Sequence, residues 1–477
     1  MRPLFFYLSI LCLLTFACEN KEQRPSSING IWKSIGSGWI LHIEDSTHYA
    51  LYDITSISCL PGRASDLQEI LPALELNRDT LSLLKGVVRY QFTRGEALPD
   101  HCREDLGREQ QDNPLYNFDV FAETVKEHYA FFQLNDLNWD QLYHQQRGKL
   151  SERSSEEDLY KVLEETLEIL KDNHAYLEAT EEFYEALEED EEDNQELVQK
   201  EESLPEYGDF QIAAMVAKHH LEEEMTKDSW LIQWGKFTDN IGFVQVKSMW
   251  LYADLDIPPS MIEDVGFVDA YVETFHKMEE GEYIEKEVKG VQKIMDQVMH
   301  DLSDMDALVF DIRFNGGGQD AVSFEILSRC VSGIQLVAKQ KLRHKNQFSP
   351  EQSLYIEGVQ DPFSKPVYVL TSPQTGSAAE AFAIATMSLN HVTRIGSHTS
   401  GAMSTALEKT LPNGWVFAIS NEIYMDTQGE NYENIGIPVD VELGYPEDRQ
   451  TFFRAIADGL LEDKQNILTA ITNLRDE

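Results

Sequence analysis

The chain has 477 residues, which at about 100–200 residues per domain predicts two to four domains, and its 42% hydrophobic and 10% aromatic residues can form a substantial core. Its 39 basic and 84 acidic side chains give a formal net charge of −45 at pH 7. A surface this acidic repels phosphate backbones, which excludes nucleic acid as an expected partner.

The first residues have the pattern of an export signal. Arg2 supplies a positive charge, and residues 4–17 form an apolar run that is shorter than the about 20 residues a membrane-spanning helix needs. The run ends in Leu-Thr-Phe-Ala-Cys18, which resembles the lipobox that is cleaved before a lipidated cysteine. We therefore expect a lipoprotein signal at 1–18, lipidation of Cys18, a tether at 19–27 and an exported protein anchored at the cell envelope, periplasmic or at the cell surface. Ordinary secretion is the alternative.

Residues 28–110 predict a small β-rich domain. Short β-like runs such as 39–43 are separated there by Gly, Asn and Pro turns. An exported protein can keep disulfides, so Cys59 and Cys102 are a candidate bridge within this domain. Cys330 lies in an apolar helical pattern much later in the chain, and we expect it to be a buried thiol.

A helical region is expected at 111–177. Apolar residues recur at helical spacing around Phe118 and again from Leu159 to Leu170. The sequence Ser-Ser-Glu-Glu at 154–157, just before the second run, has the form of a capping box. The second helix is expected to end at Lys-Asp-Asn-His174.

The next segment, 178–229, is predicted to be an acidic excursion followed by a connecting helix. Its first part is rich in glutamate and poor in large apolar residues, which is typical of a solvated, flexible loop. From 230 to 445 strand and helix patterns alternate, which predicts a mixed α/β fold with a sheet between helices. The last residues, 446–477, are expected to form a C-terminal helix.

Two motifs of this α/β region could carry chemistry. A buried strand at 307–312 runs into Asn-Gly-Gly-Gly318, where glycines let backbone N–H groups approach a developing oxyanion. A tight strand–helix turn is the simpler interpretation of the same residues. Ser377 lies between small residues where a strand gives way to a helix, whose N-terminal N–H groups and partial positive charge stabilise an anion. An ordinary N-cap is the alternative there.

The order of these motifs resembles a known family, the tail-specific (carboxyl-terminal processing) serine proteases of peptidase family S41, and most closely its tricorn-like branch. The resemblance extends over 117–443. Residues 118–142 resemble the helical segment before the core, and Leu-Lys-Asp-Asn-His174 the place of the catalytic histidine. Ser377-Ala378-Ala379-Glu380 resembles the nucleophile motif, and the segment around Glu433 resembles the late motif whose glutamate completes the site. The family implies a crotonase- or Clp-like ββα core.

The resemblance implies a serine endopeptidase that acts on proteins or peptides through an acyl-enzyme. Ser377 would be the nucleophile and His174 the base, with Glu433 supporting the imidazolium directly or through another group. The amides of Ala378 and Gly317, or Gly318, would form the oxyanion hole. No metal and no cofactor are implied, and the oligomeric state is left open.

Three features distinguish this chain from relatives with other mechanisms. The better-known branch uses a lysine base, whereas Ala402 occupies the lysine's place here, so a histidine base is expected. Asn173 stands where the tricorn-type tetrad has a serine, and no PDZ domain is recognisable after His174. His398 is a competing base. A non-catalytic ligand-binding or scaffold lipoprotein on the same fold is the alternative function, although the combination of Ser377, His174 and Glu433 favours the peptidase.

Overall fold

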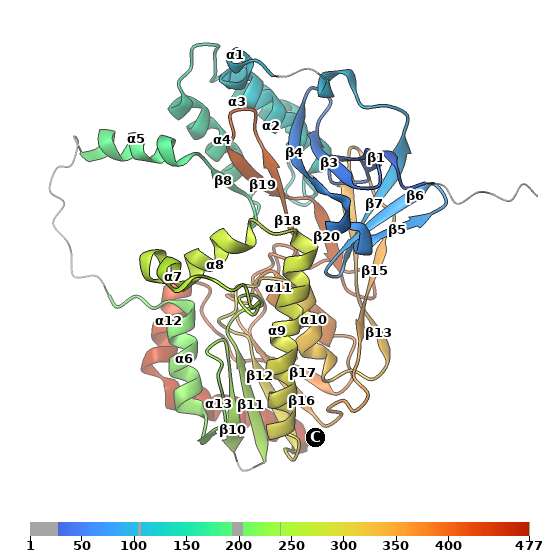
Figure 1. Ribbon diagram of the computed structural model, residues 1–477. Coiled ribbons are helices and arrows are strands. Elements are labelled where there is room, and N and C mark those ends of the chain that lie inside the picture. Colours follow the sequence, from blue (N-terminus) through green and yellow to red (C-terminus); the bar gives the residue numbers. More distant parts are fainter. Residues whose placement is uncertain (1–26, 104–105, 193–203, 239, 477) are drawn as a thin grey trace, which may run out of the picture.

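The computed structural model describes residues 27–103, 106–192, 204–238 and 240–476 (Figure 1). The expected signal, Cys18 and nearly all of the tether therefore lie outside the described residues. Within the described ranges, no helix is both long enough and apolar enough to cross a membrane.

The N-terminal β-rich domain is a seven-stranded antiparallel sheet in the order β4-β3-β2-β1-β7-β6-β5. Trp32, Leu41 and Phe92 are buried on one of its faces and form a core of their own. The predicted disulfide is present, because Cys59 in β4 bonds to Cys102 after the last strand. The strands are β1 (Gly30–Ser34), β2 (Trp39–Ile43), β3 (His48–Ile54), β4 (Cys59–Asp66), β5 (Leu74–Asn77), β6 (Thr80–Lys85) and β7 (Val88–Gly95).

Both predicted helices of the next region are present. The second is capped one residue later than expected, because the Ser155 hydroxyl accepts from the Asp158 N–H and the Asp158 carboxylate accepts from the Ser155 N–H. It ends where Lys171 adopts a left-handed conformation with φ 54°. The elements are α1 (Arg108–Gln111), α2 (Pro114–His128), α3 (Trp139–Arg147), α4 (Glu156–Leu170) and β8 (Tyr176–Glu178).

The acidic segment does not begin as a loop. A helix, α5 (Glu181–Glu192), occupies its first part, and Phe183 on this helix is buried against the helical region. An apolar anchor within an otherwise glutamate-rich run explains why a composition-based expectation of a solvated loop was wrong here. The connecting helix is α6 (Asp209–His220).

A hairpin from the α/β region completes the helical region. Its strands are β18 (Ala406–Thr410) and β19 (Val416–Ser420), and β19 pairs with β8. Phe417 of the hairpin packs edge-on against Phe121 of α2, with ring centroids 4.9 Å apart. The structural boundary of the helical region therefore differs from the sequence boundary at 177.

The α/β core is a second seven-stranded sheet in the order β21-β17-β16-β12-β11-β10-β9, parallel from β11 to β21. Alternate side chains of β12 point to opposite faces, so Leu308 packs with α9 to α11 and Val309 with α6, α12 and α13. The strands are β9 (Glu223–Glu224), β10 (Ile232–Thr238), β11 (Ile241–Val246), β12 (Ala307–Asp311), β16 (Val367–Thr371), β17 (Val392–Gly396) and β21 (Val441–Glu442).

Helices cover both faces of this sheet (Figure 1). The expected single C-terminal helix is two helices that meet at Gly459. The helices are α7 (Pro259–Val265), α8 (Phe267–Phe275), α9 (Glu280–Asp301), α10 (Asp320–Ser328), α11 (Ala378–Thr386), α12 (Arg449–Asp458) and α13 (Leu460–Asp476). A smaller sheet beside them contains β13 (Ile334–His344), β14 (Gln347–Phe348), β15 (Gln352–Glu357) and β20 (Glu422–Met425).

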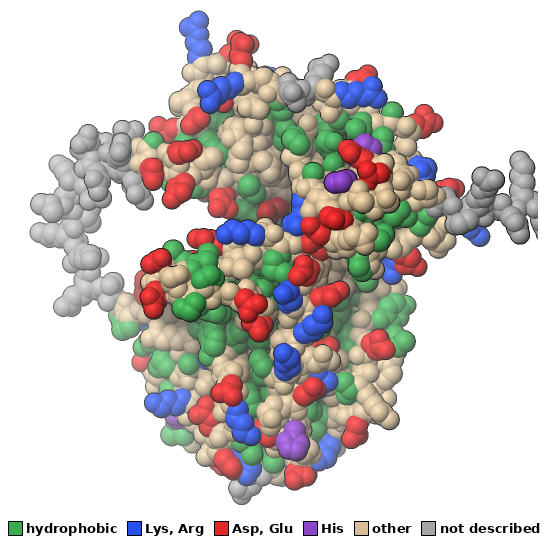
Figure 2. All heavy atoms as spheres, in the orientation of Figure 1, with side chains coloured by type: hydrophobic (Ala, Val, Ile, Leu, Met, Phe, Trp, Pro, Cys, Tyr) green, Lys and Arg blue, Asp and Glu red, His purple; other side chains and the backbone are tan. Residues whose placement is uncertain are grey.

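The N-terminal domain is attached to the rest of the molecule by polar contacts. The buried Lys409 amino group pairs with Asp53, and Lys85 pairs with Glu280 at 2.8 Å. Figure 2 shows acidic side chains spread over one face of the assembled molecule, with a hollow between the upper and lower halves.

Candidate active site

Ser377 lies between the end of β16 and the start of α11. Its backbone has φ 51° and ψ −125°, a conformation that L-residues with a side chain adopt rarely and at a cost of about 1–3 kcal/mol. The surroundings hold it there, because the Ser377 N–H donates to the Ala402 carbonyl oxygen at 3.1 Å. The serine is thus strained and fixed at a helix N-terminus, which favours a functional role over that of a simple cap.

The glycine loop lies directly against Ser377, as the sequence predicts. Gly317 has φ +114°, and a Cβ at this position would lie 2.7 Å from the Ser377 Cβ. The Asn315 side chain accepts a hydrogen bond from the Gly317 N–H at 2.9 Å, so this amide already has a partner. A Cβ on Gly318 would instead meet the backbone of Met249, 2.5 Å away. The glycines therefore allow two close backbone approaches.

Of the two amides expected to bind an oxyanion, those of Gly317 and Ala378, the Ala378 amide is the one without a hydrogen-bond partner in the described part of the chain. It opens α11, and among the described residues its N–H has no hydrogen-bond acceptor. The N–H groups in the first turn of a helix point outward along the axis, where an anion is stabilised.

His174 and Ser377 share one pocket although they are 203 positions apart in the sequence. His174 Nδ1 is buried and has no hydrogen-bond partner among the described residues. Burial lowers the pKa of His174 below its usual 6.5, and the negative charge of Asp172 partly opposes this shift. The imidazole is therefore mainly neutral at pH 7, as a general base must be. The residues that line the pocket are Asn173, His174, Gly316, Pro373, Gln374, Gly376, Ser377, Ser400 and Ala402.

Asp172 fixes the histidine turn to the hairpin. One of its carboxylate oxygens accepts from the His174 N–H at 3.0 Å and from the Ser420 hydroxyl at 2.6 Å, and the other accepts from the Ser420 N–H at 2.7 Å. This role was not predicted from the sequence. The available signal was an Asp two residues before the histidine just after a helix, because Asp in such a turn bonds the backbone two residues on.

Glu380 holds the loop on the other side of the serine. Its buried carboxylate accepts hydrogen bonds from the N–H groups of Gly401 and Ala402, both at 2.8 Å, and from the hydroxyls of Thr399 and Ser400. Ala402, in the place of the lysine of other relatives, thereby contributes backbone atoms to the pocket and no base.

Glu433 is buried beside the same loop and does not contact His174 among the described hydrogen bonds and ion pairs. Its carboxyl group accepts from the N–H groups of Met403 and Ser404 at 3.0 and 3.2 Å. Burial raises the pKa of Glu433 to about 8, with smaller contributions from the charges of Glu380 and Asp172. The group is therefore protonated at neutral pH, and a direct link to the imidazole is absent from this conformation.

His398 and Asn173 are the other two residues that the sequence places near the site. Both ring nitrogens of His398 have hydrogen-bond partners, because Nε2 contacts the Glu447 carboxylate at 2.9 Å and Nδ1 contacts the Thr399 carbonyl oxygen at 2.8 Å. His398 does not line the pocket. The Asn173 amide donates to the Gly401 carbonyl at 3.4 Å, a long contact between the histidine turn and the glutamate-held loop. Among the described residues, no group of three or more His, Cys, Asp or Glu side chains could hold a metal ion.

Comparisons with known proteins agree with this architecture. Residues 268–443 match the model of peptidase family S41, and residues 110–168 match the C1 domain of tricorn protease. A search of curated proteins gave no match.

Two solved structures have the same fold. A candidate peptidase from Parabacteroides merdae ATCC 43184 is 21% identical over 73% of this chain and 97% of that chain, with a TM-score of 0.50. Mature CPAF complexed with lactacystin is 13% identical over 76% of this chain and 99% of that chain, also with a TM-score of 0.50. Residues 268–443 thus match peptidase family S41, and the match of the helical region to tricorn protease and the shared fold agree with this family.

Proposed function

We propose that this protein is a serine endopeptidase that cleaves proteins or peptides through an acyl-enzyme. The observation that carries the proposal is the pocket in which a strained Ser377, at the N-terminus of α11, lies with His174 and the glycine loop. The match of residues 268–443 to peptidase family S41 supports a peptidase of this kind. A purely ligand-binding protein would have no need for a neutral histidine and a strained serine in one pocket.

In this mechanism His174 removes the proton from the Ser377 hydroxyl as its oxygen attacks the substrate carbonyl. The Ala378 N–H receives the oxyanion, and Gly317 adds a second donor by sharing its N–H between Asn315 and the oxyanion. Losing one such donor typically costs about 2.7–4 kcal/mol. His174 then passes the proton to the leaving amine, and water hydrolyses the acyl-enzyme.

We assign Glu433 a positioning role. Because its pKa is raised to about 8, it is neutral at pH 7 and holds the 403–404 backbone by hydrogen bonds. Asp172 is the carboxylate whose charge acts on His174, so it is the better candidate for stabilising the imidazolium.

The first test is cleavage of an unstructured protein by residues 19–477. Ser377→Ala and His174→Ala should each abolish cleavage, while His398→Ala should keep it. A serine-directed fluorophosphonate should label the parent chain and leave Ser377→Ala unlabelled. If the parent chain neither cleaves nor becomes labelled, the non-catalytic binding function takes precedence.

We also propose that the mature protein begins at Cys18, is lipidated there and is anchored at the cell envelope. The support is the apolar run that ends at Cys18, and the Cys59–Cys102 disulfide fits an oxidising compartment. Metabolic labelling with an alkyne fatty acid should mark the full chain, and Cys18→Ala should lose the label. An unlabelled parent chain would contradict lipidation.

A further inference from the structure

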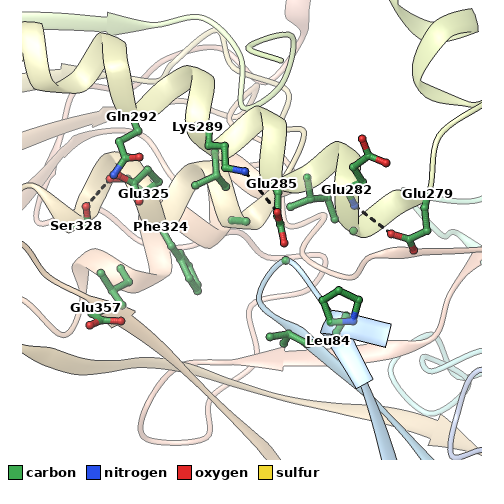
Figure 3. A pocket seen from close by; sticks show the side chains of 18 of the residues that line it. Leu84, Glu279, Glu282, Glu285, Lys289, Gln292, Phe324, Glu325, Ser328 and Glu357 are labelled. Carbon is green, nitrogen blue, oxygen red and sulfur yellow. Dashed lines mark hydrogen bonds and ion pairs between the residues drawn. The ribbon is translucent and has the colours of Figure 1, made fainter. Parts of the chain in front are cut away.

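A second cleft lies where the N-terminal domain meets the core, and it shares no lining residue with the Ser377 pocket. Its volume is about 790 Å³. Figure 3 shows it between α9, α10 and the tip of β6, with Leu84 and Phe324 pointing inward. Its floor is apolar, formed by Pro72, Ala73, Leu84, Ile284, Val288, Ala321, Phe324, Tyr355 and Ile356.

The rim of this cleft is acidic. Six glutamates and one lysine line it, so acidic side chains outnumber basic ones around the apolar floor. Four of the glutamates also pair with a cation outside the lining, namely Arg63, Lys85, Lys286 and Arg329. Lys289 pairs with Glu285 at 3.6 Å, but both side chains are about 70% exposed, and such a pair contributes little. Glu357 has no ion pair among the described residues. The glutamates are Glu69, Glu279, Glu282, Glu285, Glu325 and Glu357.

One wall of the cleft is the free edge of a β-strand. Among the described strands, β15 is the last of its sheet and pairs only with β13. Tyr355, Ile356 and Glu357 are consecutive and all line the cleft. Because successive side chains of a strand point to opposite faces, they can line one cavity only where it runs along the strand edge. Unpaired backbone groups at such an edge can bind an extended peptide.

We propose that this cleft is an exosite that binds an extended, basic and apolar segment of a protein substrate. Backbone groups of the segment would pair with β15, its apolar side chains would fill the floor, and its lysines or arginines would reach the glutamate rim. The assignment of the bound segment to a substrate rests on the proposed peptidase function, whereas the binding itself does not.

The cleft is also close in structure to the proposed catalytic serine. α10 contributes Ala321, Phe324 and Glu325 to the cleft, and on another side its Ser323 hydroxyl donates to the Ala378 carbonyl at 2.5 Å. A segment docked here would therefore be separated from the N-terminus of α11 by a single helix. Such an exosite would supply substrate selection, for which no PDZ domain is recognisable in the sequence after His174.

Binding can be tested separately from cleavage in the Ser377→Ala chain. The probe is a fluorescein-labelled peptide in which lysine and valine alternate, followed by fluorescence anisotropy. We expect it to bind, and the same peptide with glutamate for lysine not to bind. Glu282→Lys with Glu285→Lys should weaken binding about tenfold or more, because both replace rim charges.

The matched control makes the same charge change on an exposed helix elsewhere. Glu157→Lys with Glu168→Lys on α4 should change the affinity less than about twofold. Equal losses in the two double variants would mean that only the net charge attracts the peptide, and this would overturn the proposal. Binding of the glutamate peptide as tight as that of the lysine peptide would overturn it as well.

The apolar part of the cleft has its own test. Tyr355 is 54% exposed, so Tyr355→Ala should leave the fold intact and weaken binding of the lysine–valine peptide several-fold. Ile334→Ala, on the neighbouring strand and 74% exposed outside the cleft, should have no effect. Equal affinities for these two variants would contradict docking along β15.

The link to a substrate is tested in the chain with Ser377 present. Appending the lysine–valine segment to an unstructured substrate should raise kcat/KM, and Glu282→Lys with Glu285→Lys should remove only that gain. If the peptide binds but nothing is cleaved, the peptidase function fails and the binding site remains. If cleavage occurs but the appended segment gives no gain, the exosite assignment fails and the peptidase remains.

Discussion

At the scale of single residues, the position of Ser377 depends on the absence of a side chain at Gly317. The serine keeps an unfavourable positive φ, and the glycine approaches so closely that a methyl group would collide with the Ser377 Cβ and the Gly376 carbonyl. The position of the hydroxyl is therefore determined by backbone packing, which a side-chain substitution elsewhere would not easily disturb.

Gly317→Ala should reduce kcat/KM about a hundredfold or more, since displacing a reacting group by an ångström has an effect of that order. Its Cβ would lie 2.7 Å from that of Ser377, at a φ of +114°. Gly333→Ala is the matched control, because Gly333 also has a positive φ, +67°, but no atom within 4 Å of an added Cβ. Similar activity of the two variants would contradict the close packing.

The Asp172 carboxylate should influence the pH at which activity rises on the acid side of the pH–rate profile, because its charge acts on His174. Only neutral His174 can accept a proton, so activity should rise with pH through a pKa below 6.5. Asp172→Asn removes a charge that raises this pKa, so the limb should move to lower pH. The plateau should fall about tenfold or more, because the imidazolium formed during attack loses its negative neighbour.

The comparison variant for this profile is Glu433→Gln. Glu433 is already protonated at pH 7, so an amide of the same shape should leave the acid limb in place. A limb that moves with Glu433→Gln and stays with Asp172→Asn would reverse the roles that we assign to the two carboxyl groups.

At the scale of elements, a helix from the C-terminus supports the glycine loop. Arg313, fully buried at the start of the loop, pairs with Asp311 at 2.7 Å and with Asp463 of α13 at 2.8 Å. Asp463 also contacts His220 of α6 at 3.0 Å. Two helices on one face of the sheet are thus tied to the strand end from which the loop departs.

Asp463→Asn should lower the free energy of unfolding by about 3 kcal/mol, because breaking a buried charge pair leaves Arg313 with one anionic partner. Asp209→Asn is a suitable control, since the pair of Asp209 with Arg449 is 2.6 Å long but nearly half exposed on both sides. It should cost less than about 1 kcal/mol. Urea unfolding of both variants measures the difference, and equal losses would contradict the role of α13.

The elements that could be predicted are those whose signal is local. α2 and α4 have clear helical periodicity, and the buried strand β12 is a continuous apolar run. The β18–β19 hairpin could not be assigned to the helical region, because its pairing with β8 joins segments about 240 residues apart in the chain. Propensity and periodicity carry no information about such partners.

The same division holds for the candidate site. The order of motifs predicted a site with Ser377, His174 and the glycine loop, and the structure brings all three together. The anchoring by Asp172 and the unpaired Nδ1 of His174 depend on contacts with Ser420 and on burial, which no local pattern contains. Glu433, predicted to support His174, instead holds the Met403 and Ser404 amides, and its raised pKa results from burial by the fold.

At the scale of the whole molecule, the fold retains a proton on Glu433 that the unfolded chain would release at pH 7. Glu380, Glu422 and Glu433 are almost fully buried, and burial raises the pKa of each, that of Glu433 to about 8. The formal charge of −45 counts Glu433 as ionised. The folded protein at pH 7 therefore carries less negative charge than its sequence indicates, which reduces repulsion within an acidic molecule.

This difference predicts a stability that falls as the pH rises from about 5 to 8. Below the unfolded pKa of about 4.5 both states hold the Glu433 proton, and the contribution of this group to stability is fully present. Between that value and the folded pKa of about 8 only the unfolded chain releases the proton, so each pH unit costs at most about 1.4 kcal/mol per group. The glutamine in Glu433→Gln cannot ionise, so this variant should lack the part of the pH-dependent stability loss that Glu433 causes.

Urea unfolding of the parent chain and of Glu433→Gln between pH 5 and pH 8, at high salt to screen surface charges, measures this share. The parent chain should lose stability relative to the variant across the whole interval. Glu380 and Glu422 are the same in both chains, so the comparison reports on the replaced Glu433. A stability difference that stays constant with pH would mean that Glu433 is ionised in the folded state, and its hydrogen bonds to the Met403 and Ser404 amides would then outweigh the effect of burial.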